Sequence, residues 1–135
     1  MNHRDTESAE IKDLNEISGE VIGAAIEVHR HLGPGLLESA YEACLSHELR
    51  LRGLVVEKQV PIPVFYKGVK IDCAYRLDFL IAKKVIVELK AVEKILPIHE
   101  AQTLTYLKLC KLRLGLIINF NIPILKNGIK RLLNH

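Results

Sequence analysis

The region from residue 71 to residue 90 constrains the fold most strongly, because it predicts two β-strands around a short turn. From Ile71 to Ile81, apolar residues alternate with mostly polar ones, as in a strand with one face on the core. The run KKVIVELKAV supplies the next strand, and three charged residues, Asp78, Glu88 and Lys90, lie within this hairpin. A charge in a packed sheet costs several kcal/mol unless it is paired, solvated or bound to a metal, so these charges need a reason.

The alternation of side chains predicts that the three charged residues share one face of the hairpin. A continuous apolar face on the other side requires three opposed pairs: Ile81 with Val85, Phe79 with Val87, and Leu77 with Leu89. This register sets Asp78 opposite Glu88. It requires an odd number of turn residues around Ala82-Lys83-Lys84, or a bulge, since a two-residue turn would put Asp78 on the wrong side.

Two carboxylates a few ångströms apart repel each other, which raises their pKa values unless a cation lies between them. A Mg²⁺ ion fits such a pair, because it is commonly held by one or two carboxylates together with water and substrate phosphate. Lys90 could then orient or deprotonate the attacking water, or neutralise charge that develops on phosphate. The hairpin therefore predicts an ion site for phosphodiester chemistry. The alternative is a solvated row of salt bridges, against which the apolar Leu80 and Ile86 on the same face argue.

Two helices are expected before the hairpin. Apolar residues at steps of three and four indicate a helix from about Asp13 to Leu32, and residues 1–12 are expected to be flexible. A second helix follows from about Gly35 to Arg52 and ends at Gly53. Its expected inward residues are Leu37, Tyr41, Cys44, Leu45 and Leu49.

Further strands and one more helix complete the expected order. Pro61 and Pro63 each lack an N–H, so the strand after Gly53 should lie at an edge or contain a break. A third helix can begin with Pro97, and the run LRLGLIINFN is apolar enough for a strand covered on both faces. The sequence of the tail, PILKNGIKRLLN, is compatible with either a short strand or a helix. The order is ααβββαβ plus the tail, an α/β chain with a central mixed sheet flanked by helices.

Length and composition favour a single domain over residues 1–135. The polar N-terminal stretch does not have the pattern of a signal peptide, and no apolar run is long enough for a membrane span, so a cytoplasmic protein is expected. Cys44, Cys73 and Cys110 are odd in number and each lies in an apolar pattern, which suits reduced core thiols. A net charge of +3, spread along the chain, permits a polyanionic partner without requiring one.

Two further motifs accompany Asp78 and the ELK run. The third helix carries QTLTY, from Gln102 to Tyr106, and GLLESAY occupies residues 35–41. In this order the residues resemble the PD-(D/E)XK nuclease superfamily, whose sites take an Asp from one strand and a Glu-x-Lys from the next. QTLTY is similar to the Gln-xxx-Tyr element of its RecB-like members, and GLLESAY matches the pattern that names the GxxExxY protein family. The similarity extends to the GIKR stretch near the end of the chain.

The resemblance implies a restriction-endonuclease-like αβββαβ core of α+β type, with an extra helix at the N-terminus. It also implies a Mg²⁺ or Mn²⁺ ion held by Asp78, Glu88 and a backbone oxygen near Leu89. Glu38 would reach the same site from the second helix. Leu77 occupies the place of the superfamily's nominal proline, a position that varies.

The other candidate residues each have two interpretations. Glu38 is a metal or water ligand beside Tyr41, itself a candidate for orienting or binding the substrate, or Glu38 is an ordinary acidic residue in the first turn of a helix. His99, Gln102 and Tyr106 follow steps of three and four and share one helix face. They either orient the catalytic lysine and contact phosphate, or they pack and cap against the sheet.

The leading hypothesis is a Mg²⁺- or Mn²⁺-dependent nuclease that hydrolyses DNA phosphodiesters through Asp78, Glu88 and Lys90. The second is a catalytically silent nucleic-acid-binding or protein-interaction module on the same fold. It is motivated by the small size of the chain and its low net positive charge. A metal hydrolase with a non-nucleic substrate is the third. The two N-terminal helices carry more apolar surface than a small sheet needs, which predicts association, for instance as a homodimer.

Overall fold

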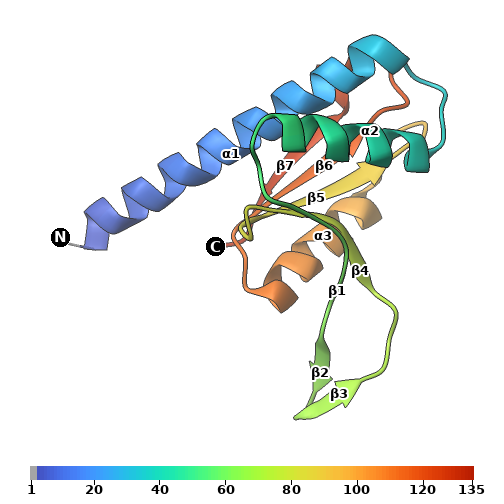
Figure 1. Ribbon diagram of the computed structural model, residues 1–135. Coiled ribbons are helices and arrows are strands. Elements are labelled where there is room, and N and C mark those ends of the chain that lie inside the picture. Colours follow the sequence, from blue (N-terminus) through green and yellow to red (C-terminus); the bar gives the residue numbers. More distant parts are fainter. Residues whose placement is uncertain (1–2) are drawn as a thin grey trace.

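The computed structural model describes residues 3–135 and places helices on both faces of one central sheet. The helices of this part of the chain are α1 (His3–Leu32), α2 (Glu38–Leu51) and α3 (Pro97–Cys110). The sheet consists, in spatial order, of β1 (Val56–Pro61), β4 (Arg76–Ile81), β5 (Val85–Lys90), β6 (Leu114–Asn119) and β7 (Ile129–Leu133). A separate hairpin contains β2 (Val64–Tyr66) and β3 (Val69–Ile71), and the 3₁₀ turn η1 (Leu125–Gly128) precedes β7. Figure 1 shows α1 and α2 above the sheet and α3 below it.

The sheet is mixed, as expected from the order of the elements. Strands β5 and β6 run parallel and are joined by α3, while the other neighbours are antiparallel. In the β4–β5 hairpin, Phe79 lies opposite Val87 and Ile81 opposite Val85, which confirms the predicted register for these pairs. Three turn residues, 82–84, join the strands, and this odd number keeps the paired apolar side chains on one face.

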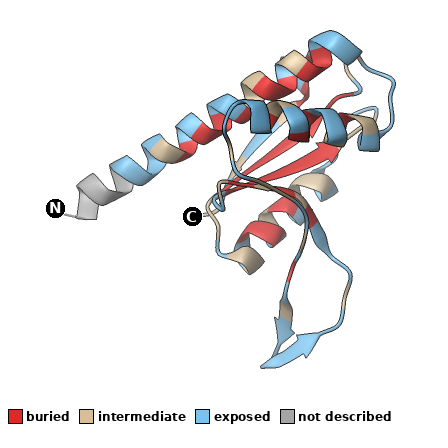
Figure 2. Ribbon diagram, in the orientation of Figure 1, coloured by how far each residue is buried: buried red, intermediate tan, exposed pale blue. Residues whose placement is uncertain are grey.

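Two apolar clusters fill the space between the sheet and the helices. The larger cluster lies under α1 and α2, and the smaller lies under α3. Strand β6 separates them and all of its residues are buried, which confirms the prediction of a strand covered on both faces. Figure 2 shows this burial along the central strands and on the inward faces of the helices. The apolar stripe predicted for α1 is confirmed by the burial of Leu14, Ile17, Val21, Ala24, Ala25 and Val28, whereas its last expected residue, Leu32, is exposed.

The single strand expected from Ile71 to Ile81 is wrong, because the structure divides it. Strand β3 ends at Ile71 and pairs with β2, and β4 begins only at Arg76. The cause is the pair of prolines in the neighbouring segment, since a proline cannot donate to the sheet. Between them the Ile62 N–H still bonds to the carbonyl of Tyr75 at 2.9 Å. The predicted break beside Pro61 and Pro63 is therefore confirmed, and β1 lies at the sheet edge.

Helix boundaries differ from the sequence analysis in two places. Helix α1 already begins at His3, and residues 1–2 of the segment expected to be flexible lie outside the described residues. Helix α2 begins at Glu38, so Leu37 precedes it and is 79% exposed instead of pointing inward. Cys44 is also exposed, because the buried stripe of α2 follows steps of four and leaves this position outside. The tail forms η1 and then β7, so its interpretation as a strand is confirmed.

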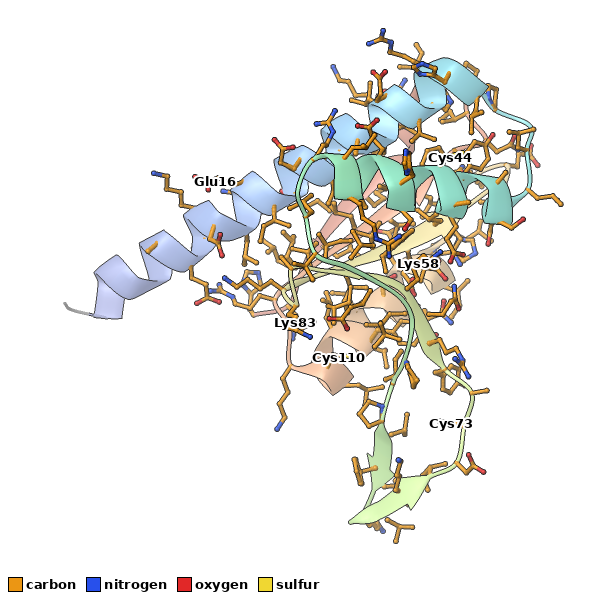
Figure 3. The ribbon with its side chains drawn as sticks, viewed as in Figure 1. Glu16, Cys44, Lys58, Cys73, Lys83 and Cys110 are labelled. Atoms are coloured by element: carbon orange, nitrogen blue, oxygen red, sulfur yellow. The ribbon has the colours of Figure 1, made fainter. Side chains whose placement is uncertain are left out.

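The three cysteines are free and lie far apart: Cys44 on α2, Cys110 at the end of α3, and Cys73 in the segment between β3 and β4 (Figure 3). Cys73 and Cys110 are half-buried, whereas the prediction of a core thiol is wrong for the exposed Cys44. Within residues 3–135, no helix combines the length and apolar character that crossing a membrane requires.

Two glycines give a matched pair of stability predictions. A Cβ at Gly128 would lie 2.5 Å from the carbonyl oxygen of Asn119, so Gly128→Ala must displace the main chain. We expect a loss of more than about 2 kcal/mol in the free energy of unfolding. A Cβ at Gly19, exposed in α1, meets no atom within 4 Å, so Gly19→Ala should stabilise by about 0.5–1 kcal/mol. Urea unfolding measures both values, and a Gly128→Ala variant as stable as the natural sequence would contradict the packing described at Gly128.

Candidate active site

Asp78 and Glu88 lie side by side on β4 and β5, and each carboxylate accepts a hydrogen bond from a backbone N–H of the other strand. The Asp78 N–H donates to Oε2 of Glu88 at 2.8 Å, and the Leu89 N–H donates to Oδ2 of Asp78 at 2.9 Å. Regular pairing of the two strands extends only from Ile81 and Val85 to Phe79 and Val87. Beyond it, the two carboxylates continue the link between the strands. The other oxygens, Oδ1 and Oε1, are the atoms that could bind a cation.

Asp78 also marks a break in pairing toward the edge strand. The β1–β4 register pairs Lys58 with Phe79 and Val60 with Leu77, and it passes over Gln59, whose φ is 52°. Among the described residues, Asp78 therefore has no paired residue on either neighbouring strand. Such irregularities often lie next to active sites, where they redirect a side chain.

The break also corrects the pairing expected between Leu77 and Leu89. Leu77 packs in the smaller cluster under α3, whereas Leu89 belongs to the larger cluster under α1 and α2. The apolar face predicted for the hairpin therefore ends at Phe79. The physical reason is that β4 leaves the regular ladder at Asp78, so the alternation of faces does not continue past it.

Glu88 carries an electrostatic strain that a cation would relieve. Its side chain is only 6% exposed. Burial, and then the negative charge of Asp78, raise the pKa of Glu88 from 4.5 to about 8, while the ammonium of Lys90 acts in the opposite direction. A cation bound beside Glu88 would offset this cost, because its positive charge favours the ionised form of the carboxylate.

The donor set fits Mg²⁺ or Mn²⁺. Among the described residues no group of three or more His, Cys, Asp or Glu side chains could hold a metal ion. A divalent ion bound here would be coordinated by two carboxylates. It would complete its coordination shell with a backbone oxygen, water or phosphate, as Mg²⁺ commonly does. Structural zinc usually takes four protein ligands, so these residues do not suit it.

Lys90 is the last residue of β5 and lies half-buried, two residues beyond Glu88. Its carbonyl accepts the Phe120 N–H at 2.9 Å, which ties the end of the strand to the segment after β6. The amide of Asn119, 1% exposed, bonds the backbone of Val92 in both directions, at 3.1 and 2.9 Å. Asn119 was not among the residues expected from the sequence, although a polar residue that ends an apolar strand could have indicated it.

Tyr106 extends from α3 toward the two carboxylates. It is 7% exposed, and burial raises the pKa of its hydroxyl, with further contributions from Glu88, Tyr75 and Asp78. The ring of Tyr75 lies at 6.2 Å from the ring of Tyr106, tilted by 56°. Tyr75 was not among the candidate residues expected from the sequence, because it lies in the segment that was expected to form one continuous strand.

Gln102 and His99 occupy the first half of α3. Gln102 is exposed, one turn before Tyr106. His99 uses Nδ1 to accept the Leu96 N–H at 3.0 Å, which caps the start of the helix. The capping interpretation of His99 therefore has direct support in its contacts.

Glu38 contacts the end of β5 and not the carboxylate pair. Its Oε1 accepts the Ala91 N–H at 3.2 Å, one residue beyond Lys90. The side chain is exposed in the first turn of α2. The structure thus brings Glu38 to the strand that carries Glu88 and Lys90, and gives it a clear role in holding the end of that strand.

Tyr41 lies in the larger apolar cluster, on the α1 and α2 face of the sheet. It is fully buried and its ring stacks on Phe120 at 4.5 Å. The hydroxyl donates to the Gly33 carbonyl at 2.6 Å and accepts the Leu36 N–H at 3.1 Å. Both hydrogen-bonding roles are used within the α1–α2 connection, so the expectation that Tyr41 orients substrate has no support in its contacts.

Tyr41→Phe tests this structural role. The change leaves the Gly33 carbonyl and the Leu36 N–H without the hydroxyl, so we expect it to lower the free energy of unfolding by about 1–3 kcal/mol. Affinity for Mn²⁺ should stay within twofold. Chemical unfolding and isothermal titration measure the two effects, and a variant of unchanged stability with weakened Mn²⁺ binding would show the assignment to be wrong.

Comparison with known families places these residues in a family context. The model of the PD-(D/E)XK nuclease superfamily matches residues 15–132, which include every candidate residue described above. No curated protein and no solved structure matches the chain.

Proposed function

Because the chain belongs to the PD-(D/E)XK nuclease superfamily, we propose that it is a metal-dependent nuclease that hydrolyses DNA phosphodiester bonds at Asp78, Glu88 and Lys90. The observation that carries the proposal is the buried Glu88 carboxylate beside Asp78 in the interrupted β4–β5 hairpin. The mixed sheet and three helices are consistent with the restriction-endonuclease-like fold of the superfamily. Membership of the GxxExxY group, based on GLLESAY at residues 35–41, is part of the same proposal.

Asp78, Glu88 and the backbone oxygen of Leu89 would hold Mg²⁺ or Mn²⁺. When bound, such an ion supplies Lewis acidity toward a phosphate oxygen and lowers the pKa of water. By holding such an ion at their free oxygens, the two carboxylates would let the site accept a phosphate that they would otherwise repel. Glu38 would keep the end of β5 in place through the Ala91 N–H.

Lys90 supplies the positive charge of the site. Its ammonium would bind a phosphate oxygen or orient the attacking water, and it would offset the charge that develops on the phosphate. Tyr106 packs in the smaller cluster on the α3 side, and its ring would limit access of water to Glu88 from that side. Gln102, exposed on the same helix, would contact the DNA backbone, and His99 would fix the start of that helix.

The direct test is cleavage of end-labelled single-stranded and duplex DNA with Mg²⁺, with Mn²⁺ and with EDTA. The proposal expects products with either metal and none with EDTA. Absence of cleavage with both metals, in a protein that is folded and binds DNA, would contradict it. Assignment to the cytoplasm and to a homodimer stays a prediction that fractionation and sedimentation can examine.

A catalytically silent binding module is the second candidate. It is favoured by the two backbone hydrogen bonds that already occupy one oxygen of each carboxylate. Titration with Mn²⁺ separates the candidates, because a silent module should bind DNA without any metal affinity that depends on Asp78 or Glu88.

A further inference from the structure

The β2–β3 hairpin projects away from the sheet and the helices (Figure 1), and its surface is exposed (Figure 2). We call residues 63–75, which contain this hairpin and its return to β4, the arm. All residues of β3 and two of the three in β2 are exposed. Because the arm buries little against the rest of the chain, the stability of the core does not explain its composition.

The arm carries all the exposed aromatic side chains of the protein. The chain has four Tyr, three Phe and no Trp. Phe65, Tyr66 and Tyr75 are 62%, 64% and 52% exposed, whereas the other four aromatic residues are buried. Single exposed apolar residues are ordinary on a protein surface, but their concentration on one projecting segment indicates a binding surface.

Basic residues are interleaved with these aromatic residues. Lys67 and Lys70 are exposed on the hairpin, and the Lys67 ammonium lies 5.5 Å from the centre of the Tyr66 ring. Arg76 follows directly after the arm, and Asp72 is the one acidic residue in it. Lysines on an exposed strand edge also oppose pairing with a second copy of the same edge, because their like charges would meet.

The arm leads directly to the carboxylates. Its last residue, Tyr75, packs against Tyr106, and Asp78 lies only three residues farther along the chain. A hollow of about 510 Å³ lies at the base of the arm, between residues 61–63 and residues 70–73. Its volume is in the range of small-ligand pockets and could accept one base next to Lys70.

From this arrangement we infer that the arm binds a single-stranded segment of the DNA substrate and guides it to Asp78 and Glu88, an inference that rests on the proposed nuclease function. Bases would stack on Phe65 and Tyr66, and the lysines would contact phosphates. Stacking on protein side chains requires bases that are not already stacked and paired, so the occupant is single-stranded DNA and not duplex. Stacking tolerates any base, so little sequence preference follows.

The test measures DNA affinity in EDTA, so that cleavage plays no part. The probe is a fluorescein-labelled oligo(dT) of about 15 nucleotides, compared with a blunt duplex, because single-strand site sizes are roughly 4–16 nucleotides. The double variant Phe65→Ala/Tyr66→Ala should bind oligo(dT) about 10- to 100-fold more weakly, with duplex affinity unchanged within twofold. Lys67→Gln/Lys70→Gln should reduce the slope of log affinity against log salt by about 1.4.

Two matched variants control for surface polarity and folding. Leu37→Ala/Leu51→Ala removes two apolar side chains that are 79% and 69% exposed at the ends of α2, and it should leave oligo(dT) affinity unchanged. Phe65→Tyr/Tyr66→Phe keeps both rings and should retain the affinity of the natural sequence. Thermal unfolding of the double alanine variant should be unchanged, since both side chains are exposed.

Unchanged oligo(dT) affinity in the double alanine variant would overturn the inference, as would an equal loss for duplex. A shift from dimer to monomer in sedimentation, with DNA affinity intact, would assign the arm to self-association instead. The nuclease proposal fails separately. Metal-dependent cleavage with no effect of the arm variants rejects only the arm, whereas arm-dependent binding without cleavage rejects only the nuclease.

Discussion

Glu88→Gln and Lys90→Ala are each expected to lower the rate of DNA cleavage by about a hundredfold to ten-thousandfold in Mg²⁺. Glu88→Gln removes one of two negative charges that would hold the ion, while its amide oxygen can still accept the Asp78 N–H. Lys90→Ala removes the ammonium whose charge lowers the pKa of Glu88, without touching that hydrogen bond. Single-turnover cleavage of labelled DNA measures the rates, because this step reports chemistry apart from product release.

Matched controls lie in the loop after β5. Glu93→Gln and Lys94→Ala make the same changes at exposed positions and should keep the full rate. Retention of activity in either Glu88→Gln or Lys90→Ala would remove that residue from the catalytic assignment. Equal losses in the control variants would point to a general effect of charge on DNA binding instead.

The metal-free protein should become more stable when Glu88 is replaced by Gln at high pH. The pKa of Glu88 is raised from 4.5 to about 8 by burial and by the charge of Asp78, so the folded state prefers the protonated form. The stability that this preference contributes is fully present below pH 4.5 and is lost as the pH rises through about 8. At pH 9 in EDTA, Glu88→Gln should exceed the natural sequence in free energy of unfolding by roughly 2 kcal/mol or more.

Urea unfolding at pH 5 and at pH 9 measures this effect, with Glu93→Gln as the control of equal charge change. The stability difference should shrink toward zero at pH 5, because Glu88 is then largely protonated in the folded state. Saturating Mg²⁺ at pH 9 should stabilise the natural sequence and not Glu88→Gln, since only the former retains both carboxylates. A variant that is less stable at pH 9 would contradict the electrostatic description of the hairpin.

The opposition between these two predictions is characteristic of a functional site. Glu88→Gln is expected both to reduce cleavage strongly and to stabilise the metal-free protein at high pH, because natural proteins keep unfavourable charges where activity needs them. A purely structural salt-bridge row would behave differently, since removing one partner from it should not improve stability.

The sequence allowed the central hairpin to be predicted because two independent patterns agree there. The alternation of apolar residues in β4 and the run in β5 admit one register that keeps Phe79 and Val87 on the same face, and the structure has that register. Pro97 at the start of α3 and the uninterrupted apolar run of β6 were similarly decisive. Local patterns determine such features, so one sequence is sufficient for them.

Other features depend on contacts that no local pattern contains. The alternation continues from β3 into β4, so it could not reveal that β3 pairs with β2 and leaves the main sheet. Tyr41 belongs to a motif that suggests a functional site, but its position is determined by stacking on Phe120, far along the chain. Asn119 could not be connected to Val92 for the same reason.

The claim that Asp78 and Glu88 share one divalent cation is tested most directly by anomalous diffraction from a crystal soaked in Mn²⁺. We expect a single strong peak within about 2.0–2.5 Å of a carboxylate oxygen from each residue. A map without that peak, or with Mn²⁺ bound at other groups while the two carboxylates keep only their backbone hydrogen bonds, would contradict it.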